Sequence, residues 1–544
     1  MLRYVVKRIR YKMRKLLGHY KLQSSICIVL IVVAAAINIY AGYQLTSFYD
    51  ILNSQNIQNA IKKGFFLALV WIVAVALQYL AEGYQAYLSK LFNIHLRDGI
   101  MEKISVCSNE NFSRKEGGEY ASWLVNDVQL IGKNAITPFF LIVKGASMTV
   151  FAVIALMKLH WILLICSIVS AIILSIIPNL FDKRLKSIVE KLSACNESFS
   201  QSAYDLLGGF EVFFVTDKIH KMTEKIRDTY VSSENEKYRF EIQSTIMKML
   251  MDSIYRIFEL SLDILAAILS FLGIVNYGVV FAMSNLTNRF LMGTDSLFTN
   301  MTLLRSAEGI FEKLDHWTFD DAESKNQQEA PSIERSIDVE NLVIHYPGAD
   351  VRVGEYYTFE IGKHYAIVGE SGRGKTSLVR AVIGLNNQYD GRILFDGIER
   401  RSYHDKSVLK QFAYISQHTY LFTDTMRFNL TLGEKYSDEE LYRMLEKVNL
   451  TEFISESEEG LDRMISNQQN NISGGQRQRI GIARALLQRK KIYIIDEGTS
   501  ALDYKNAALI EDFFLSNPEY TILFITHHLD LSAKKFDKVY SIKS

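Results

Sequence analysis

Residues 369–377 have the types and the spacing of a phosphate-binding loop. Glycines recur where backbone N–H groups must converge on an anion, and a lysine and two hydroxyl residues follow them. The loop comes after an apolar run at 365–368 and opens a helical pattern, so a helix N-terminus adds its dipole to the site. We expect a nucleotide to be bound here by Gly369, Glu370, Ser371, Gly372, Arg373, Gly374, Lys375, Thr376 and Ser377.

Two acidic residues end a second apolar run at 492–495, which Lys491 precedes. Asp496, together with the hydroxyl of Thr376, is expected to hold Mg²⁺, while Lys375 reaches the outer phosphates. Glu497 follows one residue later, where its carboxylate can polarise a water for attack on the γ-phosphate. These residue types at these positions predict magnesium-dependent hydrolysis of ATP.

A third element, Ile472-Ser-Gly-Gly-Gln476, is a glycine-rich turn that enters a helical pattern at 477–489. A helix cap would account for Ser473, but not for the glycines and glutamine followed by Arg-Gln-Arg. The segment resembles the signature of the ABC transporter superfamily, LSGGQ, with Ile472 in place of leucine. The resemblance implies contacts to ATP from Ser473, Gly474, Gly475 and Gln476.

The resemblance extends through the C-terminal 209 residues, 336–544, counting both ends. It implies that Tyr346 stacks on adenine, that Gln417 contacts Mg²⁺ and the coupling helices, and that Asp503 belongs to the D-loop. His527 corresponds to the switch histidine, with His528 a weaker candidate; a histidine after a strand is otherwise more often structural. The implied catalytic residues are Glu497, His527 and Lys375, and the implied metal ligands are Thr376, Gln417 and Asp496.

In this superfamily two cassettes enclose ATP, each site combining the phosphate loop of one with the signature of the other. One cassette per chain therefore implies a dimer. Because Lys375, Ser473, Glu497 and His527 are all present, a homodimer with two competent sites is the simpler expectation, and a heterodimer stays open.

The N-terminal half contains apolar runs long enough to span a membrane, which takes ~20 residues. The polar segments between them, at 89–133 and 182–246, are rich in Lys and Arg and are expected to be cytoplasmic loops, as are both termini. A basic segment, 1–23, is expected to lie at the cytoplasmic interface rather than to bind nucleic acid. The six predicted spans, in a bacterial cytoplasmic membrane, are 24–46, 64–88, 134–158, 161–181, 247–272 and 275–300.

Polar stripes interrupt these apolar runs. The fifth run carries Asp252, Arg256, Glu259 and Asp263 along one helical face, and the second carries Gln78, Glu82 and Gln85. Charges that face lipid are costly, so the stripes are expected to line a polar cavity or to pair with one another between helices. Their slight excess of acid favours a polar, cationic cargo.

The composition further restricts which partners and bound metals are expected. The 544 residues carry 61 basic and 60 acidic side chains, a net charge of +1, which argues against nucleic acid as the main partner. The four cysteines are scattered and form no CxxC pair, so neither a disulfide framework nor a zinc site is expected.

The expected fold is therefore multi-domain: an all-α six-helix transmembrane domain followed by an α/β P-loop ATPase cassette with an α-helical subdomain. The expected boundaries are 1–23 (basic segment), 24–317 (membrane domain), 318–335 (linker) and 336–544 (nucleotide-binding domain). Residues 112–128 and 205–211 resemble the two coupling loops of exporter-type members. Residues 465–471 depart from the Glu- and Gly-rich stretch that such exporters commonly carry before the signature.

The combined expectation is ATP-driven export by alternating access, with membrane lipid around the helices. Size and polar stripes resemble bacterial exporters of peptides and peptide antibiotics, so a peptide is the first cargo expected. No peptidase domain precedes the first helix, and leader cleavage is not expected. The alternatives are a multidrug or lipid exporter, an importer that reuses the exporter fold, and a regulatory ATPase that moves nothing.

Overall fold

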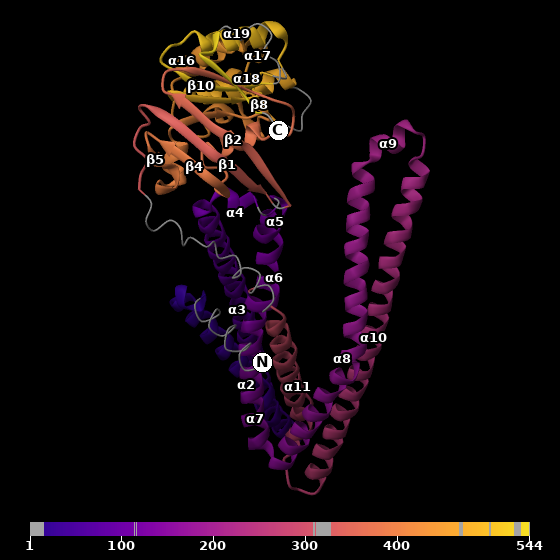
Figure 1. The fold of residues 1–544 in the computed structure, drawn as a ribbon. Coiled ribbons are helices and arrows are strands. Elements are labelled where there is room, and N and C mark those ends of the chain that lie inside the picture. Colours follow the sequence, from indigo (N-terminus) through magenta and orange to yellow (C-terminus); the bar gives the residue numbers. More distant parts are fainter. Residues whose placement is uncertain are drawn as a thin grey trace. The chain divides into compact units, whose positions relative to one another are not determined.

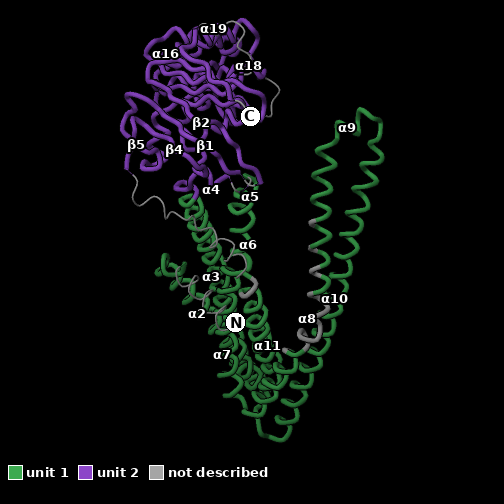
Figure 2. Tube along the Cα trace, viewed as in Figure 1, with its two compact units in different colours: residues 1–103, 117–317 green, residues 104–116, 318–544 purple. Residues whose placement is uncertain are grey.

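The chain folds into two compact units in a computed structural model (Figure 2). One comprises residues 1–103 and 117–317, and the other comprises residues 104–116 and 318–544. The structure describes residues 16–113, 115, 117–307, 311, 328–346, 348–466, 472–499, 502–526 and 535–542. We refer to the two units as the helical unit and the cassette.

Long helices make up the helical unit, and each predicted span overlaps one of them, to within three residues at its ends (Figure 1). Short helices, α5 (Gly117–Ser122) and α6 (Val128–Ile131), run on through two π turns into the third long helix. The long helices are α2 (Lys21–Asn53), α3 (Ile57–Val106), α7 (Thr137–Leu159), α8 (Trp161–Gly208), α10 (Ile219–Phe271) and α11 (Gly278–Ser306).

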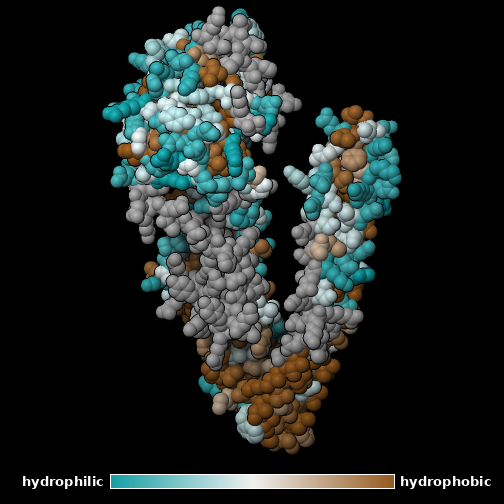
Figure 3. Space-filling model, viewed as in Figure 1, coloured by the Kyte–Doolittle hydropathy of each residue, from teal (hydrophilic) through white to brown (hydrophobic). Residues whose placement is uncertain are grey.

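Three stretches of the described chain are long and apolar enough to cross a membrane: Lys21–Asn53, Ile57–Val106 and Gly117–Leu159. A shorter apolar stretch covers Trp161–Leu174. Figure 3 shows hydrophobic residues gathered on the surface where α7 turns into α8 and α10 into α11. The count of six crossings stays a prediction, because polar side chains lower the hydropathy of α10 and α11.

The predicted cytoplasmic loops are largely helix. α8 has 48 residues and α10 has 53, which at about 1.5 Å per residue gives lengths of roughly 70–80 Å. The apolar core of a bilayer is only about 30 Å thick. The change from apolar to polar residues therefore does not mark the end of a helix, and the cytoplasmic location of these segments stays a prediction. The short α9 (Phe210–Val215) joins α8 and α10.

A parallel sheet forms the centre of the cassette. Its strand order is β11-β3-β10-β9-β6, and every neighbouring pair is parallel. Parallel strands bring their carboxyl ends to one edge, so the segments that follow β3, β6 and β9 meet there. The bounds are β3 (His364–Val368), β6 (Phe412–Ile415), β9 (Ile492–Asp496), β10 (Thr521–Thr526) and β11 (Lys538–Ser541), with α13 (Lys375–Val382) and α19 (Tyr504–Leu515) beside them.

An antiparallel sheet and a helical subdomain complete the cassette, as the expected fold class requires. The antiparallel sheet has the order β2-β1-β4-β5, with β1 (Ser336–Tyr346), β2 (Ala349–Glu360), β4 (Tyr389–Phe395) and β5 (Ile398–Glu399). The other elements are α14 (Asp405–Leu409), β7 (Asp424–Thr425), α15 (Met426–Thr431), α16 (Asp438–Lys447), α17 (Thr451–Ser455), β8 (Met464–Ile465) and α18 (Gly474–Leu487).

A short helix from the first half of the sequence, α4 (Asn109–Ser113), is part of the cassette unit. The Asn109 side chain donates to the Leu385 carbonyl at 3.1 Å, and Gln388 donates to the Glu110 carboxylate at 2.6 Å. This segment is the start of the loop that resembles a coupling loop.

A buried arginine beside α13 stabilises the cassette through an ion pair and a hydrogen bond. Arg400 is 1% exposed, pairs with Asp405 and donates to the Asn387 side-chain oxygen at 2.6 Å. A buried charge is costly unless its partners are in place, so removing one member leaves the others unsatisfied.

We therefore expect Arg400→Leu to destabilise the cassette by about 3 kcal/mol, a fall of roughly 10 °C in its melting midpoint. The matched control is Arg392→Leu, whose side chain is 66% exposed and pairs with Glu340. An exposed pair contributes at most about 1 kcal/mol. Thermal unfolding of the full-length protein in detergent measures both, and equal shifts would contradict this role for Arg400.

Candidate nucleotide site

The phosphate-binding loop runs from the end of β3 to the start of α13 and needs glycine at two positions. Gly372 and Gly374 have φ of 79° and 87°, the left-handed region that side chains disfavour. A Cβ on Gly374 would also lie 2.5 Å from Val351 Cγ1. Glycine at these positions therefore lets the backbone N–H groups turn inward.

Lys375 opens α13 and lies over the loop that precedes it. Its side chain is nearly buried, and its Nζ donates to the carbonyls of Gly369 at 2.7 Å and Glu370 at 2.9 Å. Burial lowers the pKa of this ammonium, while the carboxylates of Glu497 and Asp496 act in the opposite direction. A cation next to a helix N-terminus suits the outer phosphates of a nucleotide.

Asp496, at the end of β9, is the buried centre of the site. Thr376 Oγ1 donates to one carboxylate oxygen at 3.0 Å and the Tyr414 hydroxyl donates to the other at 3.0 Å. Burial raises the pKa of Asp496, and the hydrogen bonds from Thr376 and Tyr414 oppose that rise. A carboxylate beside a hydroxyl is the oxygen set that Mg²⁺ prefers, so these residues fit the predicted ion.

Glu497 follows Asp496 and forms hydrogen bonds through its backbone N–H, its carbonyl and its carboxylate. Its backbone N–H donates to Ile525 in β10 at 3.1 Å, and its carbonyl accepts from the Gln478 side chain at 3.0 Å. Its carboxylate accepts from Gln417 Nε2 at 2.6 Å. The φ of Glu497 is 50°, a conformation that costs a non-glycine residue about 1–2 kcal/mol. The surrounding bonds fix this carboxylate at the edge of the sheet.

Tyr346 ends β1 next to the phosphate-binding loop. Its hydroxyl donates to Ser377 Oγ on α13 at 3.0 Å, and the residue is 39% exposed. A half-exposed aromatic ring beside a phosphate site offers a face on which a base can stack.

The predicted signature residues begin α18. Ser473 is the N-cap: its hydroxyl accepts from the Gln476 N–H at 3.2 Å, and the Gln476 side chain accepts from the Ser473 N–H at 2.9 Å. This capping box explains Gln476 as well as Ser473, which corrects the expectation that a cap accounts for the serine alone. Gly474 and Gly475 form the first turn. In the described part of the chain, the hydrogen bonds of Ser473 stay within this cap.

The D-loop aspartate is likewise a helix cap. Asp503 accepts from the N–H of Asn506 at 3.0 Å and from its side chain at 2.6 Å, which lowers the pKa of Asp503. His527 and His528 lie outside the described residues, after the end of β10.

Sequence reasoning missed the roles of Tyr414 and Gln478. Tyr414 lies in β6, which pairs with β9, and a hydroxyl within a run of apolar residues was the available signal. Gln478 is a buried amide one helical turn into α18. Its burial could not be predicted from the sequence, because its neighbours are arginines.

The fold and this site define an ATP-hydrolysing cassette joined in one chain to a set of apolar membrane helices. Residues 24–294 match the ABC transporter transmembrane region, and residues 356–500 match the ABC transporter family. The chain belongs to the ABC transporters, as a half-transporter of the exporter type.

Two relatives and a solved structure are similar to this chain over most of its length. The ATP-dependent lipid A-core flippase of Vibrio vulnificus is 27% identical over 466 residues, which cover 79% of this chain and 74% of the flippase. The heterocyst differentiation ATP-binding protein HepA of a Nostoc species is 26% identical over 459 residues, 82% of this chain and 73% of HepA. A bacterial Atm1-family ABC exporter with ATP bound has the same fold, with a TM-score of 0.82, 18% identity and coverage of 96% and 93% of the two chains.

The hydrogen bond from Tyr414 to Asp496 can be tested directly. Because that bond lowers the pKa of Asp496, Tyr414→Phe raises that pKa further and favours the protonated carboxyl. We expect the acid limb of the ATPase pH profile to move to higher pH, and the Mg²⁺ concentration for half-maximal activity to rise about threefold.

The control for this variant is Tyr436→Phe, which removes a hydroxyl bonded to Glu434 and Leu487 in the helical subdomain. Identical pH profiles and magnesium requirements for the two variants would contradict the role of Tyr414.

Proposed function

We propose that two copies of this chain form a homodimer that binds two Mg²⁺–ATP and exports a polar cargo by alternating access. The observation that carries the proposal is the division of site residues within one cassette. Lys375, Thr376 and Asp496 meet at one sheet edge, while the hydrogen bonds of Ser473 are confined to its own helix cap. A signature that caps its own helix, apart from the cluster of Lys375, Thr376 and Asp496, suits contact with ATP on a second cassette.

Each site residue receives a role in this proposal. Lys375 and the loop residues 369–374 bind the phosphates, Tyr346 stacks on the base, and Glu497 positions the attacking water. Bound Mg²⁺, held by Thr376 and Asp496, would neutralise charge on the phosphates. The remaining assigned residues contact the nucleotide or its water: Ser377, Gln417, Ser473, Gly474, Gly475, Gln476, Asp503 and His527.

Gln417 has a specific task in such a cycle. Its amide is bonded to the Glu497 carboxylate, so Gln417 orients the group that positions the attacking water. Gln417 would also be one of the residues that hold Mg²⁺, and the proposal thus places the general base next to the metal site.

Exposed apolar side chains on α9 support the dimer. Val212, Phe214 and Val215 project from the tip of the α8–α10 pair, each more than 60% exposed. This tip directly follows 205–209 and includes 210–211, the end of one of the two segments that resemble coupling loops. We propose that it contacts the cassette of the partner chain, where those side chains would be covered.

The remaining topology is proposed as it was predicted: six spans in a bacterial cytoplasmic membrane, with both termini and the cassette in the cytoplasm. The Lys- and Arg-rich parts of α3, α8 and α10 support this orientation. ATP is then available to the cassettes on the side from which cargo leaves.

A polar cargo, and first a peptide, is proposed from the side chains between α3 and α7. Lys144 pairs with Glu82 at 3.1 Å, and Gln78 donates to the same Glu82 oxygen at 3.0 Å. Glu82, Gln85, Ser89, Thr137 and Lys144 line a pocket of about 380 Å³. Amides and opposite charges in one pocket can meet the backbone and termini of a peptide.

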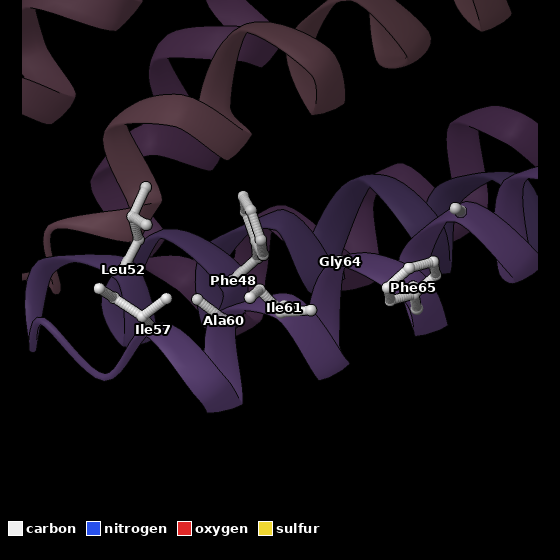
Figure 4. Close-up of a pocket in the computed structure, with 8 residues that line it drawn as sticks. Phe48, Leu52, Ile57, Ala60, Ile61, Gly64 and Phe65 are labelled. Atoms are coloured by element: carbon white, nitrogen blue, oxygen red, sulfur yellow. The ribbon is translucent and has the colours of Figure 1, made fainter.

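A lipid with a polar headgroup is the second candidate. Several relatives are named as lipid A-core flippases, and an apolar groove of about 470 Å³ lies between α2 and α3 (Figure 4). Phe48, Leu52, Ile61 and Phe65 line it, and such a surface suits an acyl chain. An importer or a regulatory ATPase would appear in transport assays as inward flux or as no flux.

Glu497→Gln tests the catalytic half of the proposal. Glutamine keeps the shape of the side chain but cannot take a proton from water, so we expect ATP turnover to fall at least 100-fold. ATP binding should persist, with about one ATP retained per chain under turnover conditions. Robust hydrolysis by this variant in purified full-length protein would remove Glu497 from its assigned role.

A substitution in the Glu82–Lys144 pair tests the proposed cargo site. We expect Glu82→Gln to reduce stimulation of ATPase activity by cargo peptides or by lipid A about fivefold, with basal activity within twofold of the original. The assay uses the full-length protein in nanodiscs. Glu224→Gln, which removes an exposed α10 carboxylate paired with Lys221, is the control.

A charge swap, Glu82→Lys with Lys144→Glu, separates a cargo contact from an interhelical pair. If the pair only holds α3 to α7, the swap restores both stability and stimulation. If the residues contact cargo, the swap restores stability while stimulation stays low. Full recovery of stimulation would therefore contradict the proposed site.

A further inference from the structure

The signature helix α18 is bonded to Glu497 of its own cassette through Gln478. This side chain is 2% exposed, and its Nε2 donates to the Glu497 carbonyl at 3.0 Å. Gln478 lies five residues after the Ser473 N-cap, so little more than one helical turn separates it from the signature serine.

The carbonyl that Gln478 holds belongs to a residue in a disfavoured conformation. Glu497 has φ of 50°, and the surroundings must impose this conformation on a residue with a side chain. Its N–H is fixed to Ile525, which leaves the carbonyl as the second fixed point of the backbone. With both points held, the side chain is directed to Gln417, whose Nε2 lies 2.6 Å from a carboxylate oxygen.

The helix that carries Gln478 has little freedom against the segment after Gln417. A Cβ on Gly481 would lie 2.4 Å from Thr419 Oγ1, 2.9 Å from its Cγ2 and 3.2 Å from its Cβ, so rotation of that threonine could not make room. Arg484 donates to the Asn429 carbonyl at 2.8 Å and to the Tyr420 carbonyl at 3.3 Å. The position of α18 therefore determines where the Gln478 amide lies.

We propose that Gln478 is a positioning residue for Glu497, and that the orientation of this carboxylate depends on the placement of α18. The proposal rests on the catalytic role proposed above for Glu497. It follows that displacing the signature helix of a cassette lowers the hydrolysis rate at the phosphate loop of that same cassette. A role limited to satisfying a buried carbonyl would affect stability but not the rate.

The first test replaces Gln478 with methionine, which matches its length but cannot donate a hydrogen bond. We expect kcat for ATP to fall 10- to 100-fold while KM for ATP changes less than threefold, because the residues that bind phosphate are untouched. The control is Gln411→Met, which removes an amide bonded to the Ala330 carbonyl at 3.5 Å. Melting midpoints and ATP binding are measured for both full-length variants.

Two double variants then test whether Gln478 acts through Glu497 and whether the placement of α18 acts through Gln478. Gln478→Met in a Glu497→Gln background should cause no further loss of rate, because the group that it positions is already absent. Gly481→Ala, which must push α18 away from Thr419, should lower kcat about fivefold alone and add nothing to Gln478→Met. Additive losses in either pair would overturn the proposal.

Other outcomes are equally decisive. A Gln478→Met variant with the original kcat, or with losses in ATP binding and melting midpoint that parallel its loss of rate, would overturn the proposal. Glu497→Gln, measured alongside, distinguishes the catalytic role of Glu497 from the positioning role of Gln478. If that variant hydrolyses ATP normally, the catalytic role of Glu497 fails; if it is inactive and Gln478→Met is not, only the role of Gln478 fails.

Discussion

The hydrogen bond from Thr376 to Asp496 is the contact on which the nucleotide site depends. It joins the first turn of α13 to the end of β9, two segments separated by 120 residues in sequence. Parallel pairing of β3 with β10 and of β10 with β9 brings those ends to one edge. A shift of register in either pair would separate the Thr376 hydroxyl from the Asp496 carboxylate. The same shift would move the phosphate-binding loop away from Glu497.

Burial of Asp496 has an energetic consequence. A carboxylate in an apolar sheet edge is disfavoured as an anion, and the raised pKa of Asp496 reflects this. Because the pKa of Asp496 is higher in the folded chain than in the unfolded chain, ionisation of Asp496 destabilises the folded state as pH rises through that raised pKa. Donors on both oxygens, and Mg²⁺ in the proposed cycle, offset that cost. The site is thus built to favour an ion that neutralises it.

The cassette could be predicted from the sequence because its chemistry lies in short contiguous segments. Residues 369–377 and 491–497 were assigned to a loop and a strand end from local pattern, and both lie where predicted. Tyr414 and Gln478 could not be found in this way. Each donates a hydrogen bond to a residue more than 18 positions distant, and side-chain pattern says which face a residue occupies but not its partner. The helical unit shows the same limit, since polarity located the stripes but not the pair that Glu82 forms.

The Glu82–Lys144 pair explains why structural and cargo roles need not exclude each other. Its side chains line a pocket, and an ion pair that water reaches through such a pocket contributes at most about 1 kcal/mol. A pair of that strength can hold α3 to α7 and still be broken by a ligand that offers a comparable charge. A fully buried pair would cost about 3–5 kcal/mol to break, too much for the proposed cargo site, which would release its cargo in every cycle.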